Sequence, residues 1–250
     1  MQPKLRYGIL FVLLLALSCT NMNKSLVIGH RGAMGHETEN SLASIQKAME
    51  MGVDMIEIDV FKIKSGEIVV FHDDKVDRLT NGKGKIESYE LTELQNLKLR
   101  GNHNIPTLQQ VLNLIDHKVR LNIELKGAHT ADSVDFIINY YLKEKGWSLD
   151  NFLISSFRWD ELKQMRALNK QIGIAILVEG DPLKALPIAK ELGAEAINPH
   201  YKELSLENVK EIRKGGFKIY PWTVNSRKDI KSMQGMGVDG IITNFPERIN

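Results

Sequence analysis

The chain has 250 residues, of which 43% are hydrophobic and 26% are charged, and its formal net charge is +2. A chain of this length and composition forms one globular domain or two small ones. Because it is so close to neutral, it lacks the basic surface that nucleic-acid binders need.

Residues 1–18 have the pattern of a secretory signal peptide. Lys4 and Arg6 precede an apolar run over residues 9–17, and a small residue and then Cys19 follow it. The run is shorter than the roughly 20 residues that span a bilayer. A buried core helix is the alternative, but no polar residue gives the run a second face. Cleavage would leave 31 basic and 31 acidic side chains in the mature protein.

Cys19 is the only cysteine, so no internal disulfide can form. Its position after the apolar run resembles the lipobox of bacterial lipoproteins, in which this cysteine is lipidated and becomes the new N-terminus. Leu17 stands where a small residue is usual, and an ordinary signal peptidase would cut after Ser18. We expect a lipid anchor at Cys19, a tether over residues 19–25, and an exported protein, periplasmic or anchored to a cell-envelope membrane.

The single domain expected over residues 26–250 alternates strand and helix patterns. Short runs rich in β-branched residues predict buried strands that begin near residues 26, 54, 119, 152, 172, 196, 218 and 240. Helical spacing of apolar residues predicts helices over residues 42–51, 108–116, 131–145, 159–168, 182–192, 205–214 and 227–236. Eight strands alternating with helices predict an α/β fold, a (β/α)8 TIM barrel.

A β-hairpin and a small insertion are expected after the second strand. Ser65-Gly66 separates two apolar runs, which is a hairpin signal. A parallel connection is the alternative, but six residues are too few for a parallel crossover. In the hairpin, Asp59 and His72 would face each other across its base. Residues 73–104 are mostly polar and are expected to form the insertion, with one short helix.

Polar side chains gather at the predicted carboxyl ends of the strands, which is where barrels of this kind hold their active sites. The hairpin would add His72 and Asp73 to the same face. The residues at the strand ends are His30, Arg31, Glu57, Asp59, Glu124, Lys126, Ser156, His200, Trp222 and Asn244.

Three of these residues, Glu57, Asp59 and Glu124, would bring carboxylates to one mouth. Unpaired, they would repel one another and raise each other's pKa values. A dication such as Ca²⁺ or Mg²⁺ relieves that repulsion, and all-oxygen ligands suit these ions better than zinc. The alternative is that the carboxylates form salt bridges with Arg31 and Lys126.

His30 and His72 lie at different strand ends. Histidine titrates near neutrality, so such a pair can act as general acid and general base in one turnover. Asp73 could orient His72, while Arg31 and Lys126 supply positive charge for a phosphate. A metal, two histidines and two cations together predict phosphodiester cleavage.

Two further strand-end residues have more than one possible role. His200 could line the pocket, and Trp222 could be a core residue or a stacking wall for the substrate, of which we expect the wall. The sequence contains no Gly-x-Ser-x-Gly elbow, P-loop or Cys-x-x-Cys pair, which excludes serine-hydrolase, nucleotide-triphosphatase and zinc-cluster chemistry.

The sequence over residues 26–249 resembles the glycerophosphodiester phosphodiesterases. The family usually has Asn-Thr where this chain has Asn40-Ser41. The motifs that carry the resemblance occur in order: His30-Arg31-Gly32, Glu39-Asn40-Ser41, Glu57-Ile58-Asp59, His72-Asp73, Leu79-Thr80-Asn81-Gly82, Ile105-Pro106-Thr107-Leu108, Glu124-Leu125-Lys126, Ser155-Ser156-Phe157, Trp222-Thr223-Val224-Asn225 and the run from Asp239 to Pro246.

The resemblance implies a substrate such as glycerophosphocholine or glycerophosphoethanolamine and, as products, sn-glycerol 3-phosphate and an alcohol. It implies attack of the glycerol 2-hydroxyl on phosphorus, after which water opens the cyclic phosphate. The residues carried over are the metal ligands Glu57, Asp59 and Glu124, the acid His30 and the base His72, and the phosphate ligands Arg31 and Lys126.

Two other functions compete with this one. A related phospholipase C- or D-like enzyme acting on phospholipids or lysophospholipids would need an apolar rim, which Leu91, Leu94, Leu97 and Leu99 could supply in an otherwise polar insertion. A non-catalytic barrel that binds phosphodiesters would be expected to lack a histidine or a metal carboxylate, and all are present.

Overall fold

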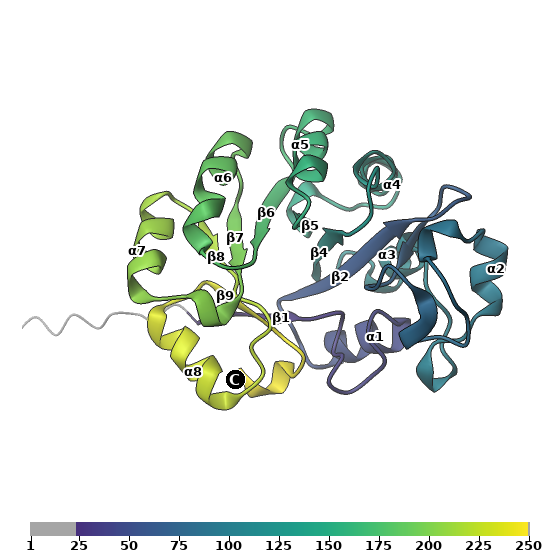
Figure 1. The fold of residues 1–250 in the computed structure, drawn as a ribbon, viewed down its shortest axis with the longest axis horizontal. Helices are drawn as coiled ribbons and strands as arrows, with labels where there is room; N and C mark the ends of the chain where they lie inside the picture. Colours follow the sequence, from purple (N-terminus) through teal and green to yellow (C-terminus); the bar gives the residue numbers. More distant parts are fainter. Residues whose placement is uncertain (1–23, 250) are drawn as a thin grey trace, which may run out of the picture.

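The computed structural model of the chain describes residues 24–249, so the expected signal peptide and Cys19 lie outside the described residues. A ring of strands is surrounded by helices, and a separate lobe projects at one side (Figure 1). In chain order the strands of the sheet are β1 (Leu26–Gly29), β2 (Met55–Lys62), β3 (Ile68–Val70), β4 (Arg120–Leu125), β5 (Phe152–Ser156), β6 (Gly173–Val178), β7 (Ala196–Pro199), β8 (Lys218–Ile219) and β9 (Gly240–Thr243).

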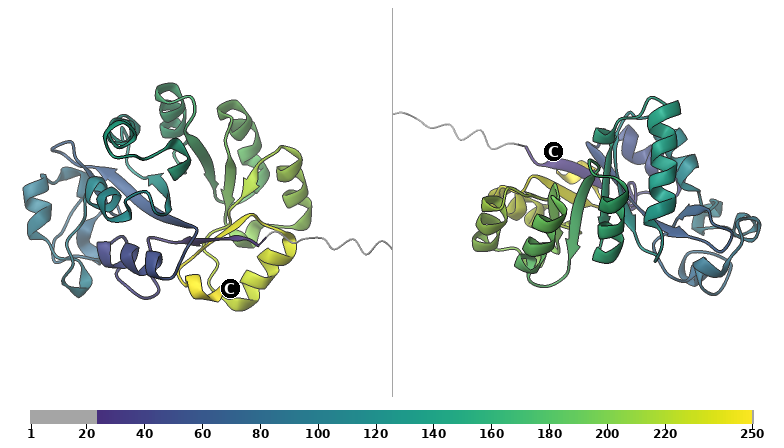
Figure 2. Two further views of the ribbon diagram at one scale, coloured as in Figure 1. Left: turned by 180° about the vertical axis from the view of Figure 1, so that it is seen from behind. Right: turned by 90° about the horizontal axis from the view of Figure 1, so that it is seen from above.

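Each barrel strand apart from β9 is followed by a helix that packs outside the ring (Figures 1 and 2). The strand order is β8-β7-β6-β5-β4-β2-β1-β9, all parallel, and β3 pairs only with β2. The expected TIM barrel with a hairpin is therefore confirmed. The helices are α1 (Leu42–Glu50), α2 (Leu91–Asn96) in the lobe, α3 (Leu108–Ile115), α4 (Ala131–Glu144), α5 (Trp159–Leu168), α6 (Leu186–Leu192), α7 (Leu206–Lys214) and α8 (Arg227–Met236).

None of the helices in the described part of the chain has the length and apolar character needed to cross a membrane.

The ring closes between β8 and β9 through an irregular segment. The strand expected over residues 218–222 is regular only as far as Ile219, because Pro221 has no N–H to continue a ladder. Closure is made instead by the backbone N–H of Ile242, 3.0 Å from the oxygen of Pro221, and by that of Val224, 2.9 Å from the oxygen of Ile242. Together with the backbone N–H of Asp239, 3.1 Å from the oxygen of Ile219, these bonds close the ring without a regular ladder between β8 and β9.

Strand alternation determines what the barrel encloses. Ile56 and Ile58 pack in the core between strands and helices, whereas Met55, Glu57 and Asp59 point into the barrel. The barrel interior is apolar towards the amino ends of the strands and polar at their carboxyl ends. The apolar layer consists of Ile28, Met55, Leu153, Ala175, Ala196, Tyr220 and Ile242.

The hairpin forms, but its register differs by one residue from the symmetric one. Lys62 pairs with Ile68, and the backbone N–H of Ile63 donates to the oxygen of Glu67 at 3.0 Å, which leaves a three-residue loop, 64–66, that ends at Gly66 with a φ of +99°. Three-residue hairpin loops require a left-handed residue at this position, which glycine supplies without strain. As a result the backbone of Asp59 bonds to that of Phe71, at 2.9 Å, and His72 lies one residue beyond the last pair.

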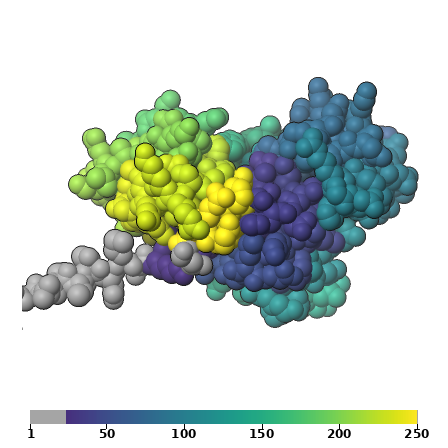
Figure 3. Space-filling model, turned by 90° about the horizontal axis from the view of Figure 1, so that it is seen from below, coloured from purple at the N-terminus to yellow at the C-terminus, as the bar shows by residue number. Residues whose placement is uncertain are grey.

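The lobe after β3 is the expected insertion, and it has a small core of its own. Leu94 and Leu99 are only 1% and 2% exposed, and Leu91 and Leu97 pack against the same cluster. Phe61 on the hairpin joins this core, which fixes the lobe to the barrel. In the space-filling view the segment after β1 lies between the C-terminal residues and the lobe (Figure 3).

At the opposite end of the barrel, Glu195 links three strands. Arg120 donates two hydrogen bonds to it, of 2.7 and 2.6 Å, and the Lys218 amino group lies 3.1 Å away. Burial by itself would raise the pKa of Glu195, but the bonds from Arg120 and Lys218 outweigh burial and lower this pKa to about 2. The carboxylate therefore stabilises the fold above pH 4.5, and this contribution is lost as the pH falls towards 2.

We expect Glu195→Gln to lower the free energy of unfolding at pH 7 by about 2 kcal/mol, because it leaves Arg120 without its ionic partner. The difference from wild type should shrink below pH 4.5, where the carboxylate of the unfolded chain begins to protonate, and should be lost as the pH approaches 2. Urea unfolding between pH 7 and pH 3 measures both effects. Glu191→Gln, at an exposed ion pair with Lys163, is the control and should cost less than about 0.5 kcal/mol. Equal costs for the two variants would contradict the analysis.

Candidate active site

The loop after β1 requires an unusual backbone. Arg31 and Gly32 have φ values of +51° and +83°, and a Cβ at Gly32 would lie 2.5 Å from the hydroxyl of Ser44. Only glycine fits there. The turn aims the Arg31 backbone N–H at a carboxylate oxygen of Glu57, 2.9 Å away, while the Arg31 carbonyl accepts a 2.8 Å bond from Ser44.

The three predicted metal-ligating carboxylates do converge. Glu57 and Asp59 come from β2 and Glu124 from β4, and Asp59 is the direct cross-strand partner of Glu124. All three are buried, and one oxygen from each lies within 4.8 Å of the others. One carboxylate oxygen of Glu57 has no hydrogen-bond partner within residues 24–249.

Burying three like charges together is costly. Burial, followed by the charges of Asp59 and Glu124, raises the pKa of Glu57 well above its usual value. Burial and Asp59 also raise the pKa of Glu124 to about 7. Arg31 and Lys126 partly offset this, because Arg31 Nε lies 3.3 Å from Asp59 and Lys126 Nζ lies 2.9 Å from Glu124.

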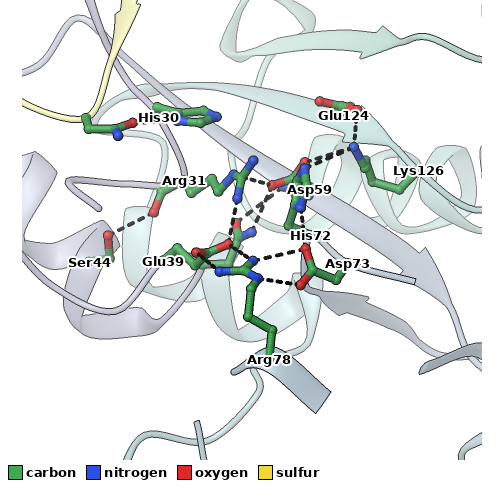
Figure 4. A network of polar contacts seen from close by, with 12 residues as sticks. His30, Arg31, Glu39, Ser44, Asp59, His72, Asp73, Arg78, Glu124 and Lys126 are labelled. Atoms are coloured by element: carbon green, nitrogen blue, oxygen red, sulfur yellow. Dashed lines mark hydrogen bonds and ion pairs between the residues drawn. The ribbon is translucent and has the colours of Figure 1, made fainter. Parts of the chain in front are cut away.

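The salt bridges considered as an alternative are therefore present, but they do not balance the charge. Four carboxylates and three cations are linked by ion pairs (Figure 4), and the carboxylate of Glu57 lies beside those of Asp59 and Glu124. With Glu57 included, two negative charges remain, which is what one dication neutralises. The all-oxygen donor set and the unpartnered oxygen of Glu57 fit a hard divalent cation such as Ca²⁺ or Mg²⁺. The linked residues are Glu39, Asp59, Asp73 and Glu124, with Arg31, Arg78 and Lys126.

His30 is held by an amide. Its Nδ1 lies 2.6 Å from the side-chain oxygen of Asn244, so Nδ1 is the protonated nitrogen in the neutral ring and Nε2 carries the lone pair. Nε2 lies 4.0 Å from Glu57. Burial, with Arg31 beside the ring, lowers the pKa of His30 to about 4, so the ring is neutral at pH 7.

His72 is held by a carboxylate, as expected. Its Nδ1 lies 2.6 Å from Asp73, and its Nε2 lies 3.3 Å from the amino group of Lys126. A carboxylate on Nδ1 stabilises the imidazolium that forms when Nε2 accepts a proton, which an amide does less well. Burial lowers the pKa of His72 in spite of the nearby Asp59.

The two histidines open onto one cavity of about 90 Å³ at the mouth of the barrel. Trp222 and Phe157 form an aromatic wall, with ring centroids 5.3 Å apart and planes nearly perpendicular. His200 does not line the cavity, contrary to one expectation, because the ring of Trp222 stands edge-on to it at 5.1 Å. The lining residues are His30, Arg31, Glu57, His72, Asn122, Glu124, Lys126, Ser155, Phe157, Leu177, Trp222, Thr223 and Ile242.

Sequence reasoning missed several residues that hold this site together. Asn40 donates a 2.9 Å bond to Asp59. Glu39 lies between Arg31 and Arg78, 2.6 and 2.8 Å from them. Glu39, Asn40 and Ser41 form one of the motifs, but residue type and spacing did not indicate these partners.

Comparisons with known proteins agree with this geometry. Residues 30–248 match the Glycerophosphoryl diester phosphodiesterase family. The chain is 35% identical over 236 residues to a glycerophosphodiester phosphodiesterase of Caldanaerobacter subterraneus subsp. tengcongensis, covering 90% of this chain and 96% of that relative.

Two solved structures extend the similarity to the fold. A phosphodiesterase of Oleispira antarctica, in complex with the product sn-glycerol-3-phosphate, has a TM-score of 0.83 and 29% identity over 90% of this chain and 94% of its own. A glycerophosphodiester phosphodiesterase of Parabacteroides distasonis has a TM-score of 0.78 and 29% identity over 91% and 95%. The chain belongs to the glycerophosphoryl diester phosphodiesterase family.

Proposed function

We propose that this protein hydrolyses glycerophosphodiesters to sn-glycerol 3-phosphate and an alcohol. The observation that carries the proposal is one cavity lined by two histidines that are each held through Nδ1, by Arg31 and Lys126, and by buried carboxylates. The product bound to the Oleispira antarctica phosphodiesterase supports the choice of substrate.

Glu57, Asp59 and Glu124 would hold one divalent cation, Ca²⁺ or Mg²⁺. When bound, the cation would supply positive charge to the phosphate oxygens as negative charge develops on them. Arg31 and Lys126 would add to this stabilisation. The guanidinium group of Arg31 can donate two parallel hydrogen bonds to the phosphate, and the ammonium group of Lys126 acts as a point charge. The positive charges of Arg31 and Lys126 would also offset the repulsion between these carboxylates and the negatively charged substrate.

The first step would be attack of the glycerol 2-hydroxyl on phosphorus. His72 Nε2 would take the hydroxyl proton, because Asp73 stabilises the resulting imidazolium. The bond from phosphorus to the alcohol would break, and His30 would give a proton to the leaving alkoxide. His30 is neutral without ligand, so it would take up that proton together with the anionic substrate. Water would then open the cyclic phosphate with the roles reversed.

The phospholipase alternative receives little support from the lobe. The four leucines that could have formed an apolar rim pack into the core of the lobe. The cavity is also small and lined by several charged side chains, which suits a glycerol phosphate better than an acyl chain. A non-catalytic barrel would have no need of two histidines with orienting partners on Nδ1.

We also propose export, with a lipid anchor at Cys19 that holds the domain at a cell-envelope membrane. The proposal rests on the sequence of residues 1–25 alone. Such an anchor would keep the enzyme near glycerophosphodiesters released from membrane lipids.

We expect the mature domain to release glycerol 3-phosphate from glycerophosphocholine with Ca²⁺ or Mg²⁺ and not with EDTA. Glu57→Gln should reduce this activity more than about 100-fold, because the cation loses a charged ligand. The metal-free variant should be at least as stable as wild type, since one repelling charge is gone. Glu203→Gln, at an exposed position on the same face, is the control. Cleavage of lysophosphatidylcholine alone would favour the phospholipase function instead.

We expect His30→Ala and His72→Ala each to lower kcat by about 10²–10⁴-fold without loss of folding, because each removes a proton-transfer group. A substrate that lacks the glycerol 2-hydroxyl should bind as a competitive inhibitor and remain intact. His117→Ala, exposed at the other end of the barrel, controls for the loss of a histidine. Hydrolysis of the deoxy substrate at the normal rate would rule out the cyclic phosphate.

For the anchor, we expect the full chain expressed in a bacterial host to incorporate labelled fatty acid and to fractionate with membranes. Cys19→Ser should be unlabelled, because serine cannot form the thioether of a lipoprotein. Release of an unlabelled wild-type protein would instead indicate an ordinary signal peptide.

A further inference from the structure

Arg78, an insertion residue outside the cavity lining, makes four hydrogen bonds that join two parts of the site (Figure 4). It lies in a 3-10 turn (Val76–Arg78) five residues after Asp73. Its Nε and Nη2 donate to the two oxygens of Asp73, at 2.6 and 3.0 Å. Asp73 in turn holds Nδ1 of His72 at 2.6 Å. A carboxylate held on both oxygens by one planar fork has a fixed orientation, and so does the imidazole bonded to it.

The other edge of the same guanidinium group bonds Glu39. Nη1 and Nη2 of Arg78 donate to its two oxygens at 2.8 and 2.9 Å. Glu39 is 6% exposed and also accepts a 2.6 Å bond from Nη1 of Arg31. Glu39 lies in the loop after β1, so Arg78 connects the insertion to the loop that carries the phosphate-facing arginine.

Charge makes Arg78 necessary for this arrangement. Asp73 and Glu39 would repel each other if they met without a cation between them. Only a fork with donors on both edges can satisfy two carboxylates at once, which a lysine ammonium cannot do in the same geometry. Because Arg78 does not line the cavity, it acts on substrate only through its partners.

We propose that Arg78 is a positioning residue that orients the acid–base histidine, His72, through Asp73. Through Glu39 it also fixes the side chain of Arg31 towards the phosphate. The insertion is thus part of the active site, and it sets both proton transfer and phosphate binding. This inference rests on the proposed hydrolysis for its kinetic consequences, but its structural consequence, the orientation of His72, stands apart from activity.

The test uses Arg78→Ala and Arg78→Lys in the mature, metal-loaded protein. We expect Arg78→Ala to lower kcat for glycerophosphocholine by about 10–100-fold, the usual effect of removing a group that orients a catalytic side chain. Guanidinium ion at millimolar concentration should restore part of the kcat of Arg78→Ala, whereas ammonium should not. Arg78→Lys should retain the charge and still show reduced kcat.

Arg78 has two arms, its hydrogen bonds to Asp73 and its hydrogen bonds to Glu39, and their effects can be distinguished by kinetics. Asp73→Asn, which breaks the arm to His72, should lower kcat with little change in KM. Glu39→Gln, which breaks the arm to Arg31, should mainly raise KM. Adding Arg78→Ala to the variant that carries both Asp73→Asn and Glu39→Gln should change kcat and KM little further, because both arms are already broken. Arg100→Ala, an exposed arginine in the same insertion, is the matched control and should leave kcat and KM unchanged.

A readout independent of activity distinguishes failure of this inference from failure of the proposed function. The ¹⁵N shifts of the His72 ring should change in Arg78→Ala and stay unchanged in Arg100→Ala. Wild-type protein that hydrolyses no phosphodiester would refute the proposed function, while the ¹⁵N shifts would still decide the role of Arg78. A folded Arg78→Ala with wild-type kcat, KM and His72 shifts would overturn the inference. If Arg78→Ala does not fold, wild-type kcat in Arg78→Lys would overturn it.

Discussion

The crowding of Glu57, Asp59 and Glu124 inside the barrel is the constraint on which the rest of the site depends. Three carboxylates on adjacent strands gain nothing from burial by themselves, and the raised pKa values of Glu57 and Glu124 record that cost. Every neighbouring feature reduces the cost: the amide of Asn40, the backbone N–H of Arg31, and the amino group of Lys126. The unbalanced charge that remains fits the divalent cation proposed for the mouth of the barrel.

The same constraint explains why the two histidines differ. Both lie near the carboxylates, but His30 is oriented by an amide and His72 by a carboxylate that is itself fixed by an arginine. The pair is therefore asymmetric before any substrate binds. Such asymmetry suits a reaction in which one histidine takes up a proton while the other gives one up.

The sequence predicted the barrel because apolar runs and helical spacing are local signals, and the strands from β1 to β9 begin within one residue of the expected positions. The convergence of the carboxylates followed from the rule that strand ends meet at one face. The contacts of Glu39, Asn40 and Arg78 could not be predicted in the same way, because they depend on how two loops and a lobe fold over the barrel. The hairpin register was wrong by one residue because the left-handed Gly66 lengthens the loop. The position of His200 at a strand end indicated that it could line the pocket, but its ring packs against Trp222 and does not line the cavity.

The ring has no regular ladder between β8 and β9, so its continuous pairing runs from β9 through β1 and round to β8. The carboxylates and both histidines are carried by a continuous stretch of paired strands, from β4 through β2 to β1, with β3 attached. The aromatic wall spans the other arc, from the residue after β5 to the segment after β8. The proposed reacting groups and the aromatic wall therefore lie on opposite sides of the ring, like the two jaws of a clamp. Because Trp222 follows β8, widening of the seam between β8 and β9 would move it relative to Phe157 and leave the pairing of β1, β2 and β4 intact.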